Sequence, residues 1–364
     1  MCLEKYASPG GGRKKGGISM AVLKEPFGRT RNGEDVDKYI LRSGELEAEV
    51  LTFGATIRRL LAPARSGEPV DVVLGYDSVR GYEDNGGYLG ALVGRYANRI
   101  AGPCCVVDGE TVPLEANEGA SKQLHGGSAG FSHRVFRAEQ TGESAVTFSL
   151  TSQAGEGGFP GTLELRATYE LCPGALKLRY EAQCDAPTYC NITNHSYFNL
   201  NGGGSAMGHR LWLGASRYTP VGTDSIPISM SRPVAGSPFD FTAEKLLGRD
   251  IDADDQQLKN VGGYDHNFVL DGAQGLRRAA RLVGDKTGIV LEVWTEKPGI
   301  QLYTANMLRT DSSGKGGETY RPRQAVCLET QFFPNSPNHP EWGDILLRPN
   351  RKYDYITEFR FSRG

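Results

Sequence analysis

Three of the six histidines lie in polar clusters where strand packing alone gives no reason for them. They are His125 in LHGG, His195 in NITNHSYFNL and His266 in YDHNF. The segment around His195 concentrates hydrogen-bonding side chains next to Phe198 and Leu200. Burying so many donors and acceptors costs free energy unless each finds a partner. The segment is therefore either a saturated internal network or the floor of a polar pocket, and its spacing alone does not choose between them.

Glu329 is a carboxylate that the sequence places in the middle of a buried strand. In AVCLETQFF the period-two alternation puts Cys327, Glu329 and Gln331 on one face, between apolar neighbours. An unpaired buried carboxylate is costly and its pKa rises, which suits a general base. The alternative is a structural salt bridge, for which Arg95 and Arg99 are available.

Asn98 and Arg99 lie in a segment that matches neither a helix nor a regular strand. GRYANRI, at 94–100, begins with a glycine and shows no clean alternation. This pattern is consistent with a loop that presents both side chains to a ligand.

Two other chemistries fit subsets of these residues. Asp265 and Glu329 would suit a glycosidase, in which two carboxyl groups flank the scissile bond. His125, His195 and Asp265 could instead bind a metal ion. The metal hypothesis is disfavoured because no H-x-H or H-x-x-x-H pair fixes two ligands on one local element, so we expect no metal.

The elements that must position these residues are strands. TLELRATYEL (162–171) and ALKLRYEAQC (175–184) alternate with period two, and Pro173-Gly174 between them predicts a hairpin. Asp108-Gly109 predicts a second hairpin, and residues 353–361 repeat the alternation. Helical patterns are confined to short stretches at 252–260 and 243–247.

These patterns predict an all-β protein built as one large antiparallel sandwich. Turn signals recur about every ten residues and no Pro- or Ser-rich linker interrupts the strands, so residues 23–364 are predicted to be a single domain. Residues 1–22 are rich in Gly, Lys and Arg, which predicts a disordered N-terminal extension.

Composition disfavours several partners and compartments. The 41 basic and 43 acidic side chains give a net charge of -2, so nothing attracts nucleic acid or anionic lipid overall. No segment approaches the roughly 18 to 20 continuous apolar residues of a membrane span. The seven cysteines are odd in number and form no C-x-x-C pair, which favours the reducing cytosol. We therefore expect a cytoplasmic protein.

Eight short segments, spread in order along the chain, form a recognisable set. They are DVVLGY (71–76), GRYANRIAG (94–102), LHGG (124–127), GEGGFPGTL (155–163), NITNHSYFNL (191–200), GGYDHNF (262–268), KPGIQLYTAN (297–306) and CLETQFFPNSPN (327–338). Together they resemble the aldose 1-epimerase family, also called galactose mutarotases. The resemblance implies a large antiparallel β supersandwich, in agreement with the strand patterns.

The resemblance also implies an activity, the interconversion of the α and β anomers of free hexoses such as galactose and glucose. It implies no cofactor, a small aldose as the partner, and a monomer or homodimer. For the proton transfers His195 should be protonated and Glu329 ionised, a state that their mutual attraction favours. The family's motifs assign Glu329 as the base and His195 as the acid, and assign sugar binding to Asn98, Arg99, His125, Asp265 and Gln301.

Two alternatives share this fold. A hexose-phosphate 1-epimerase would need a cationic cluster for the phosphate, whereas a non-catalytic sugar-binding module would keep the pocket without turnover. The presence of both Glu329 and His195 favours an enzyme.

Overall fold

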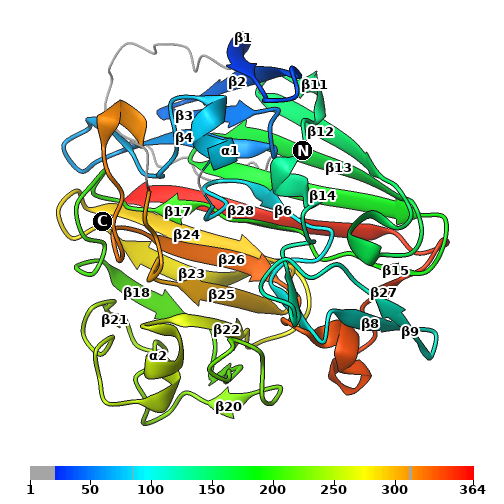
Figure 1. Ribbon diagram of the computed structural model, residues 1–364. Coiled ribbons are helices and arrows are strands. Elements are labelled where there is room, and N and C mark those ends of the chain that lie inside the picture. The colour runs from blue at the N-terminus through cyan, green and yellow to red at the C-terminus, as the bar shows by residue number, and fades with distance from the viewer. Residues whose placement is uncertain (1–20, 85, 311–313) are drawn as a thin grey trace.

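Strands are the main regular secondary structure of this computed structural model, which describes residues 21–84, 86–310 and 314–364 (Figure 1). The paired strands run antiparallel in every sheet of the described residues. Helices are few and short, so the predicted all-β class is confirmed. They are α1 (Val79–Asp84), α2 (Gln256–Val261) and the 3-10 turns Phe131–His133, Glu156–Gly158, Lys315–Gly317, Ser336–Asn338 and Pro340–Trp342.

The largest sheet has nine strands and contains the predicted hairpin. Leu163, Leu165 and Ala167 are buried while Glu164 and Arg166 between them are exposed, as the alternation predicts. In spatial order the strands are β11 (Arg137–Gly142), β12 (Ala145–Ser152), β13 (Leu163–Cys172), β14 (Ala175–Cys184), β28 (Tyr353–Arg363), β24 (Ile289–Thr295), β23 (Arg277–Val283), β18 (Arg210–Leu213) and β21 (Lys245–Leu246).

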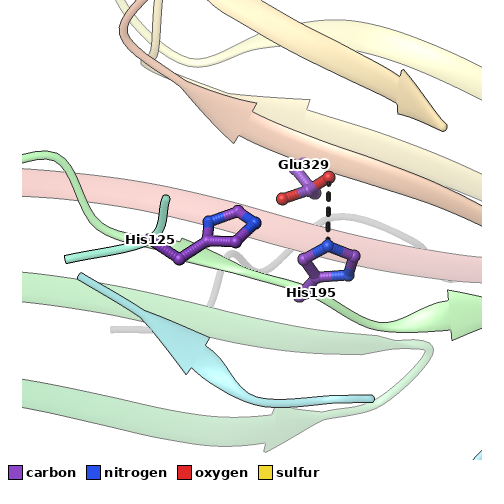
Figure 2. Close-up of side chains that lie close together, drawn as sticks. All are labelled: His125, His195 and Glu329. Carbon is purple, nitrogen blue, oxygen red and sulfur yellow. Dashed lines mark ion pairs between the residues drawn. The ribbon is translucent and has the colours of Figure 1, made fainter. Parts of the chain in front are cut away.

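A six-stranded sheet shares a hydrophobic core with the largest sheet. Ile300 and Leu302 belong to the same core cluster as Val293 and Phe359. Because side chains alternate along a strand, the opposite face carries Glu329, which lies opposite His195 (Figure 2). The spatial order is β17 (Tyr197–Phe198), β26 (Val326–Gln331), β25 (Gly299–Tyr303), β22 (Asp265–Val269), β19 (Arg217–Tyr218) and β20 (Arg232–Pro233).

The N-terminal part of the described chain forms a five-stranded sheet that packs on the largest sheet, where Tyr39 meets Phe148 edge to face. Its strands, in order, are β1 (Ala21–Arg29), β2 (Asp35–Ser43), β3 (Leu46–Leu51), β4 (Thr56–Pro63) and β5 (Pro69–Asp71). Four two-stranded pairs complete the fold: β6 (Leu92–Val93) with β16 (Thr193–Asn194), β7 (Arg99–Ala101) with β10 (Lys122–Leu124), β8 (Cys104–Val107) with β9 (Glu110–Pro113), and β15 (Thr188–Tyr189) with β27 (Leu346–Leu347).

Most local predictions hold, with two exceptions. Both hairpins form, and Asp108 and Gly109 take the positive φ angles that such a tight turn requires. The stretch at 252–260 overlaps α2, which begins at Gln256 and ends at Val261, but 243–247 is not helical, because Lys245 and Leu246 pair with β18 at the sheet edge. Helix α1 was not predicted.

The predicted N-terminal extension lies outside the described residues up to residue 20. Residues 21 and 22 belong to β1, so the last two residues of the predicted extension lie in a strand. The single domain over 23–364 stays a prediction.

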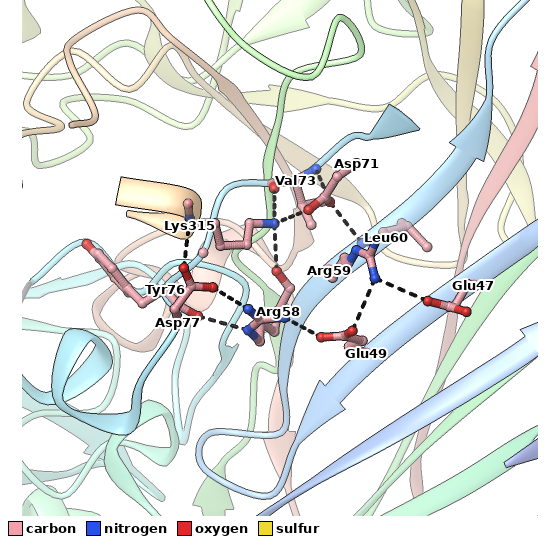
Figure 3. A network of polar contacts seen from close by, with 12 residues as sticks. Glu47, Glu49, Arg58, Arg59, Leu60, Asp71, Val73, Tyr76, Asp77 and Lys315 are labelled. Atoms are coloured by element: carbon pink, nitrogen blue, oxygen red, sulfur yellow. Dashed lines mark hydrogen bonds and ion pairs between the residues drawn. The ribbon is translucent and has the colours of Figure 1, made fainter. Parts of the chain in front are cut away.

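A half-buried lysine, Lys315, ties the connection between β25 and β26 to the N-terminal sheet (Figure 3). The ammonium of Lys315 donates to the carbonyls of Arg58, at 2.9 Å, and Val73, at 2.7 Å, and pairs with the carboxylate of Asp71. The hydroxyl of Tyr320 adds a hydrogen bond of 2.8 Å to the carbonyl of Gly75. These contacts hold the connection between β25 and β26 against the segment at residues 58–75, which is distant in the sequence.

Lys315→Met should therefore destabilise the fold. The substitution leaves the Asp71 carboxylate and two carbonyls without their donor, and we expect a loss of about 2 kcal/mol in the free energy of unfolding, measured by urea denaturation. The matched control is Lys259→Met, because Lys259 is 58% exposed and pairs with Asp254, which is 90% exposed. The control should change stability by less than about 0.5 kcal/mol. Equal effects of the two substitutions would contradict a stabilising role for Lys315.

Candidate active site

A cavity of about 460 Å³ gathers most of the residues that the sequence singled out. Segments from all along the chain converge on it. Of the predicted site residues, Gln301 alone is not in direct contact with the cavity. The described residues that line it are Gly87, Tyr88, Asn98, Arg99, Leu124, His125, His195, Tyr197, Thr223, Ser225, Asn260, Val261, Gly262, Asp265, Tyr303, Asn306, Met307 and Glu329.

Strand register places the acidic side of this site. Glu329 on β26 lies directly across from Gln301 on β25, and Asp265 on β22 lies directly across from Tyr303 on β25. The Gln301 side-chain amide donates a hydrogen bond of 2.7 Å to the Asp265 carboxylate. Gln301 is only 3% exposed, so in the free site it orients Asp265 from behind. Its direct contact with a sugar stays a prediction.

His195 lies on the opposite wall and its backbone is fixed on both sides. Its N–H donates to the carbonyl of Ala91, and its own carbonyl accepts from the N–H of Gly90, both at 2.9 Å. The imidazole lies between the rings of Tyr88 and Tyr197, with centroid distances of 5.9 and 5.1 Å. Of the two alternatives left open by the sequence, the pocket describes His195 and Tyr197, which both line the cavity.

Glu329 and His195 face each other across the pocket (Figure 2). The distance from His195 Nε2 to Glu329 Oε1 is 3.7 Å, and the two residues are 5% and 2% exposed. The other polar atoms, His195 Nδ1 and Glu329 Oε2, have no hydrogen-bond partner among the described residues. A buried pair with unused donor and acceptor capacity is suited to a polar ligand.

A backbone hydrogen bond fixes the proton of His125. The N–H of Asn98 donates to Nδ1 of His125 at 3.1 Å, so Nδ1 is an acceptor and the neutral ring carries its proton on Nε2. The opposite edge of the ring points towards Glu329 and His195 (Figure 2). His125 therefore presents an N–H donor to the space between them.

The same hydrogen bond bears on whether a metal could bind. Ligand atoms of His125, His195 and Glu329 lie within 4.8 Å of one another, which a metal ion could bridge. Binding through His125 Nε2 would need the proton to move to Nδ1, where it would face the Asn98 N–H. The donor set fits a hydroxylated ligand better than a cation. Asp265, the third ligand weighed from the sequence, is engaged by Arg99 and Gln301 instead.

The salt-bridge alternative for Glu329 does not match the contacts of the two arginines. Arg99 donates to both carboxylate oxygens of Glu118, at 2.8 and 2.9 Å, and its Nη1 lies 3.7 Å from Asp265. Arg95 is fully buried elsewhere, where it donates to Ser152 and to backbone carbonyls. Among the residues that the structure describes, Glu329 therefore has no direct arginine partner.

Burial sets the charge state of the pair, and it corrects one expectation. Removal from water raises the pKa of Glu329 well above its ordinary range, and the nearby Asp265 carboxylate raises it further, while Arg99 opposes the rise. Burial lowers the pKa of His195 to about 4. The expected charged pair is therefore wrong for the free site, because desolvating both groups costs more than one contact at 3.7 Å returns.

Several pocket residues were missed by the sequence analysis. Tyr303 shares a strand face with Gln301, so the alternation in GIQLYT could have revealed it. Tyr88, which has a positive φ of 58°, follows two glycines and carries no such signal. Met307 is 82% exposed at the cavity, and no local pattern indicates that position.

The fold and site together define an acid/base enzyme on an antiparallel β sandwich, with a pocket for a small polar ligand. The model of the family described as aldose 1-epimerase matches residues 37–360. The chain belongs to the aldose 1-epimerase family, and it is an aldose 1-epimerase, or mutarotase.

Relatives cover nearly the whole chain. Galactose mutarotase of Rattus norvegicus is 39% identical over 346 residues, covering 94% of this chain and 99% of its own. Aldose 1-epimerase of Escherichia coli K12 is 39% identical, covering 86% and 91%. The crystal structure of galactose 1-epimerase from Lactobacillus acidophilus NCFM has a TM-score of 0.84 at 30% identity, covering 95% and 100%. Within the described part of the chain, no helix is long and apolar enough to cross a membrane.

The lowered pKa of His195 can be measured directly. In ¹H–¹⁵N spectra of the imidazoles, we expect His195 to stay neutral from pH 8 until the pH approaches about 4, because the buried ring resists a charge. The chain has six histidines, and the His195 signal can be assigned by its loss in His195→Gln. Titration near the ordinary value of about 6.5 would contradict this effect of burial.

Proposed function

We propose that Glu329 and His195 interconvert the α and β anomers of free hexoses, galactose and glucose among them. The observation that supports this most is the buried pair at 3.7 Å, in which His195 Nε2 faces a Glu329 oxygen and both residues line the same pocket. In the proposed roles Glu329 is the base and His195 is the acid. The names of the relatives, galactose mutarotase and aldose 1-epimerase, agree with this substrate class.

The reaction needs only proton transfers. Glu329 takes the proton of the C1 hydroxyl while His195 gives a proton to the ring oxygen, and the bond between C1 and the ring oxygen breaks. The aldehyde rotates about the C1–C2 bond and recloses on its other face with both transfers reversed. No proton or electron is gained or lost over the cycle.

The pair must hold one proton in total at the start of the cycle. In the free site burial favours the proton on Glu329, because both groups are then neutral. A sugar hydroxyl that donates to Glu329 stabilises its carboxylate, and so favours transfer of the proton towards His195. Substrate binding thus prepares the base and the acid together.

The remaining predicted residues hold the sugar. His125 offers an N–H donor, Arg99 offers the N–H donors of Nη1, and Asp265 accepts hydrogen bonds from hydroxyls. Asn98 forms part of the same wall, and Gln301 orients Asp265. Arg99 would also stabilise negative charge that develops on the open form.

The contacts favour a free sugar over a sugar phosphate. Arg99 is the only Lys or Arg among the described residues that line the cavity, and two carboxylates already engage it. A monomer or homodimer is proposed, because every predicted site residue lies on this one chain. A cytoplasmic location is proposed because Cys104, Cys105, Cys184, Cys190 and Cys327 are free thiols.

Glu329→Gln tests the role of the base. The amide keeps the size of the side chain but cannot accept the C1 proton, so kcat should fall by about 10² to 10⁴-fold. The measurement is mutarotation of α-D-galactose by polarimetry, with the spontaneous rate subtracted. Galactose binding by calorimetry and the circular dichroism spectrum should stay close to wild type. A Glu329→Gln protein with the wild-type rate would remove Glu329 from the mechanism, and the same comparison with His195→Asn tests the acid.

The pH dependence of kcat/KM should follow the pair as a unit. Below about pH 4 His195 becomes protonated while Glu329 keeps its proton, so the pair has no base and activity falls. Above the raised pKa of Glu329 the last proton leaves and no acid remains. We expect an acid limb near pH 4 and a basic limb well above the ordinary range of a glutamate. An acid limb near about 6.5 would mean that His195 titrates like a solvent-exposed histidine.

A further inference from the structure

Glu118 does not line the cavity, but it holds a side chain that does. Nε and Nη2 of Arg99 donate to the two carboxylate oxygens of Glu118, at 2.8 and 2.9 Å. This paired geometry fixes the plane of the guanidinium group. Nη1 is left on the side of Asp265, whose carboxylate lies 3.7 Å away. The orientation of Arg99 towards a ligand therefore depends on Glu118.

The same carboxylate is connected to a second part of the pocket wall. Lys122 Nζ lies 3.3 Å from Glu118 and donates a hydrogen bond of 2.7 Å to the carbonyl of Asp224. Asp224 lies between Thr223 and Ser225, which both line the cavity. The backbone N–H of Glu118 also donates to the carbonyl of Lys122, so the two side chains share one short turn.

We propose that Glu118 is a positioning residue for the sugar site, which orients Arg99 and, through Lys122, the turn that carries Thr223 and Ser225. The inference rests on the proposed function, in which Arg99 holds sugar hydroxyls. Glu118 itself touches neither the sugar nor the reacting atoms.

The charge of Glu118 gives this role a measurable consequence. Arg99 opposes the rise in the pKa of Glu329 and of Asp265, whereas Glu118 raises the pKa of Asp265. Without the charge of Glu118, the Arg99 cation acts uncompensated, so the pKa of Asp265 falls, and we expect the pKa of Glu329, which Arg99 also lowers, to fall with it. The titratable and charged groups that face this cluster are Tyr88, Arg99, Lys122, His125, Asp265, His195, Tyr197, Tyr303, Cys327 and Glu329.

Glu118→Gln is the primary test. Loss of the paired hydrogen bonds lets the guanidinium turn, so KM for galactose should rise about tenfold, while kcat changes by less than about threefold. The basic limb of kcat/KM against pH should move to lower pH, because the pKa of Glu329 falls. A purely structural role would lower the melting temperature without moving that limb.

Three further variants separate charge from contact. Glu118→Asp keeps the charge with a shorter reach, so the basic limb should stay at its wild-type position while KM is intermediate. Lys122→Met should raise KM, because it removes the hydrogen bond to the Asp224 carbonyl. It should not move the basic limb to lower pH, because it removes no negative charge. Glu110→Gln, at an exposed position of β9, removes the same charge from the surface and should change neither quantity.

Glu118→Gln with a wild-type KM and an unmoved basic limb would overturn the proposal. So would a change in melting temperature alone. The proposed function fails separately, if the wild-type protein does not accelerate mutarotation. In that case the affinity for galactose in calorimetry, compared between wild type and Glu118→Gln, still decides whether Glu118 positions the sugar site.

Discussion

Exclusion of water from Glu329 and His195 is the constraint on which the rest of the site depends. Neither group can be charged cheaply where it lies, so small differences in their contacts decide where the single proton resides. One hydrogen bond from a hydroxyl to an oxygen of Glu329 is enough to change which of the two residues holds the proton. Proton transfer between Glu329, His195 and the sugar therefore requires that the side chains around this pair keep fixed positions.

Strand register fixes the positions of the side chains in the site. Glu329 and Gln301 are direct cross-strand neighbours, and Asp265 is reached through Gln301 by a hydrogen bond. His195 is held by backbone hydrogen bonds on both sides of its peptide. The long connection between β25 and β26 is fastened by Lys315 to the N-terminal sheet (Figure 3). The acid lies between β16 and β17, and β17 pairs directly with β26, which carries the base.

Local alternation in the sequence was enough to predict the hairpin of β13 and β14 and the buried face of Glu329. It could not predict Glu118 or Tyr88, because their roles come from contacts with Arg99 and the histidines that only the folded chain creates. The family resemblance assigned His195, for which the residues alone left two interpretations. The charge state was wrong because alternation reveals which face is buried, and not how completely water is excluded from it.

One backbone N–H separates two chemistries that these side chains could support. Two imidazoles and a carboxylate within 4.8 Å would suit a metal ion, if both rings offered a lone pair. The Asn98 N–H occupies Nδ1 of His125 and so leaves a proton on the nitrogen that faces the pocket. That ring then donates to an oxygen atom, as a sugar hydroxyl or ring oxygen requires. Asn98 takes a positive φ of 67° to make this contact, a backbone conformation that asparagine tolerates better than most residues, so the choice between the two chemistries is built into the turn that precedes Arg99.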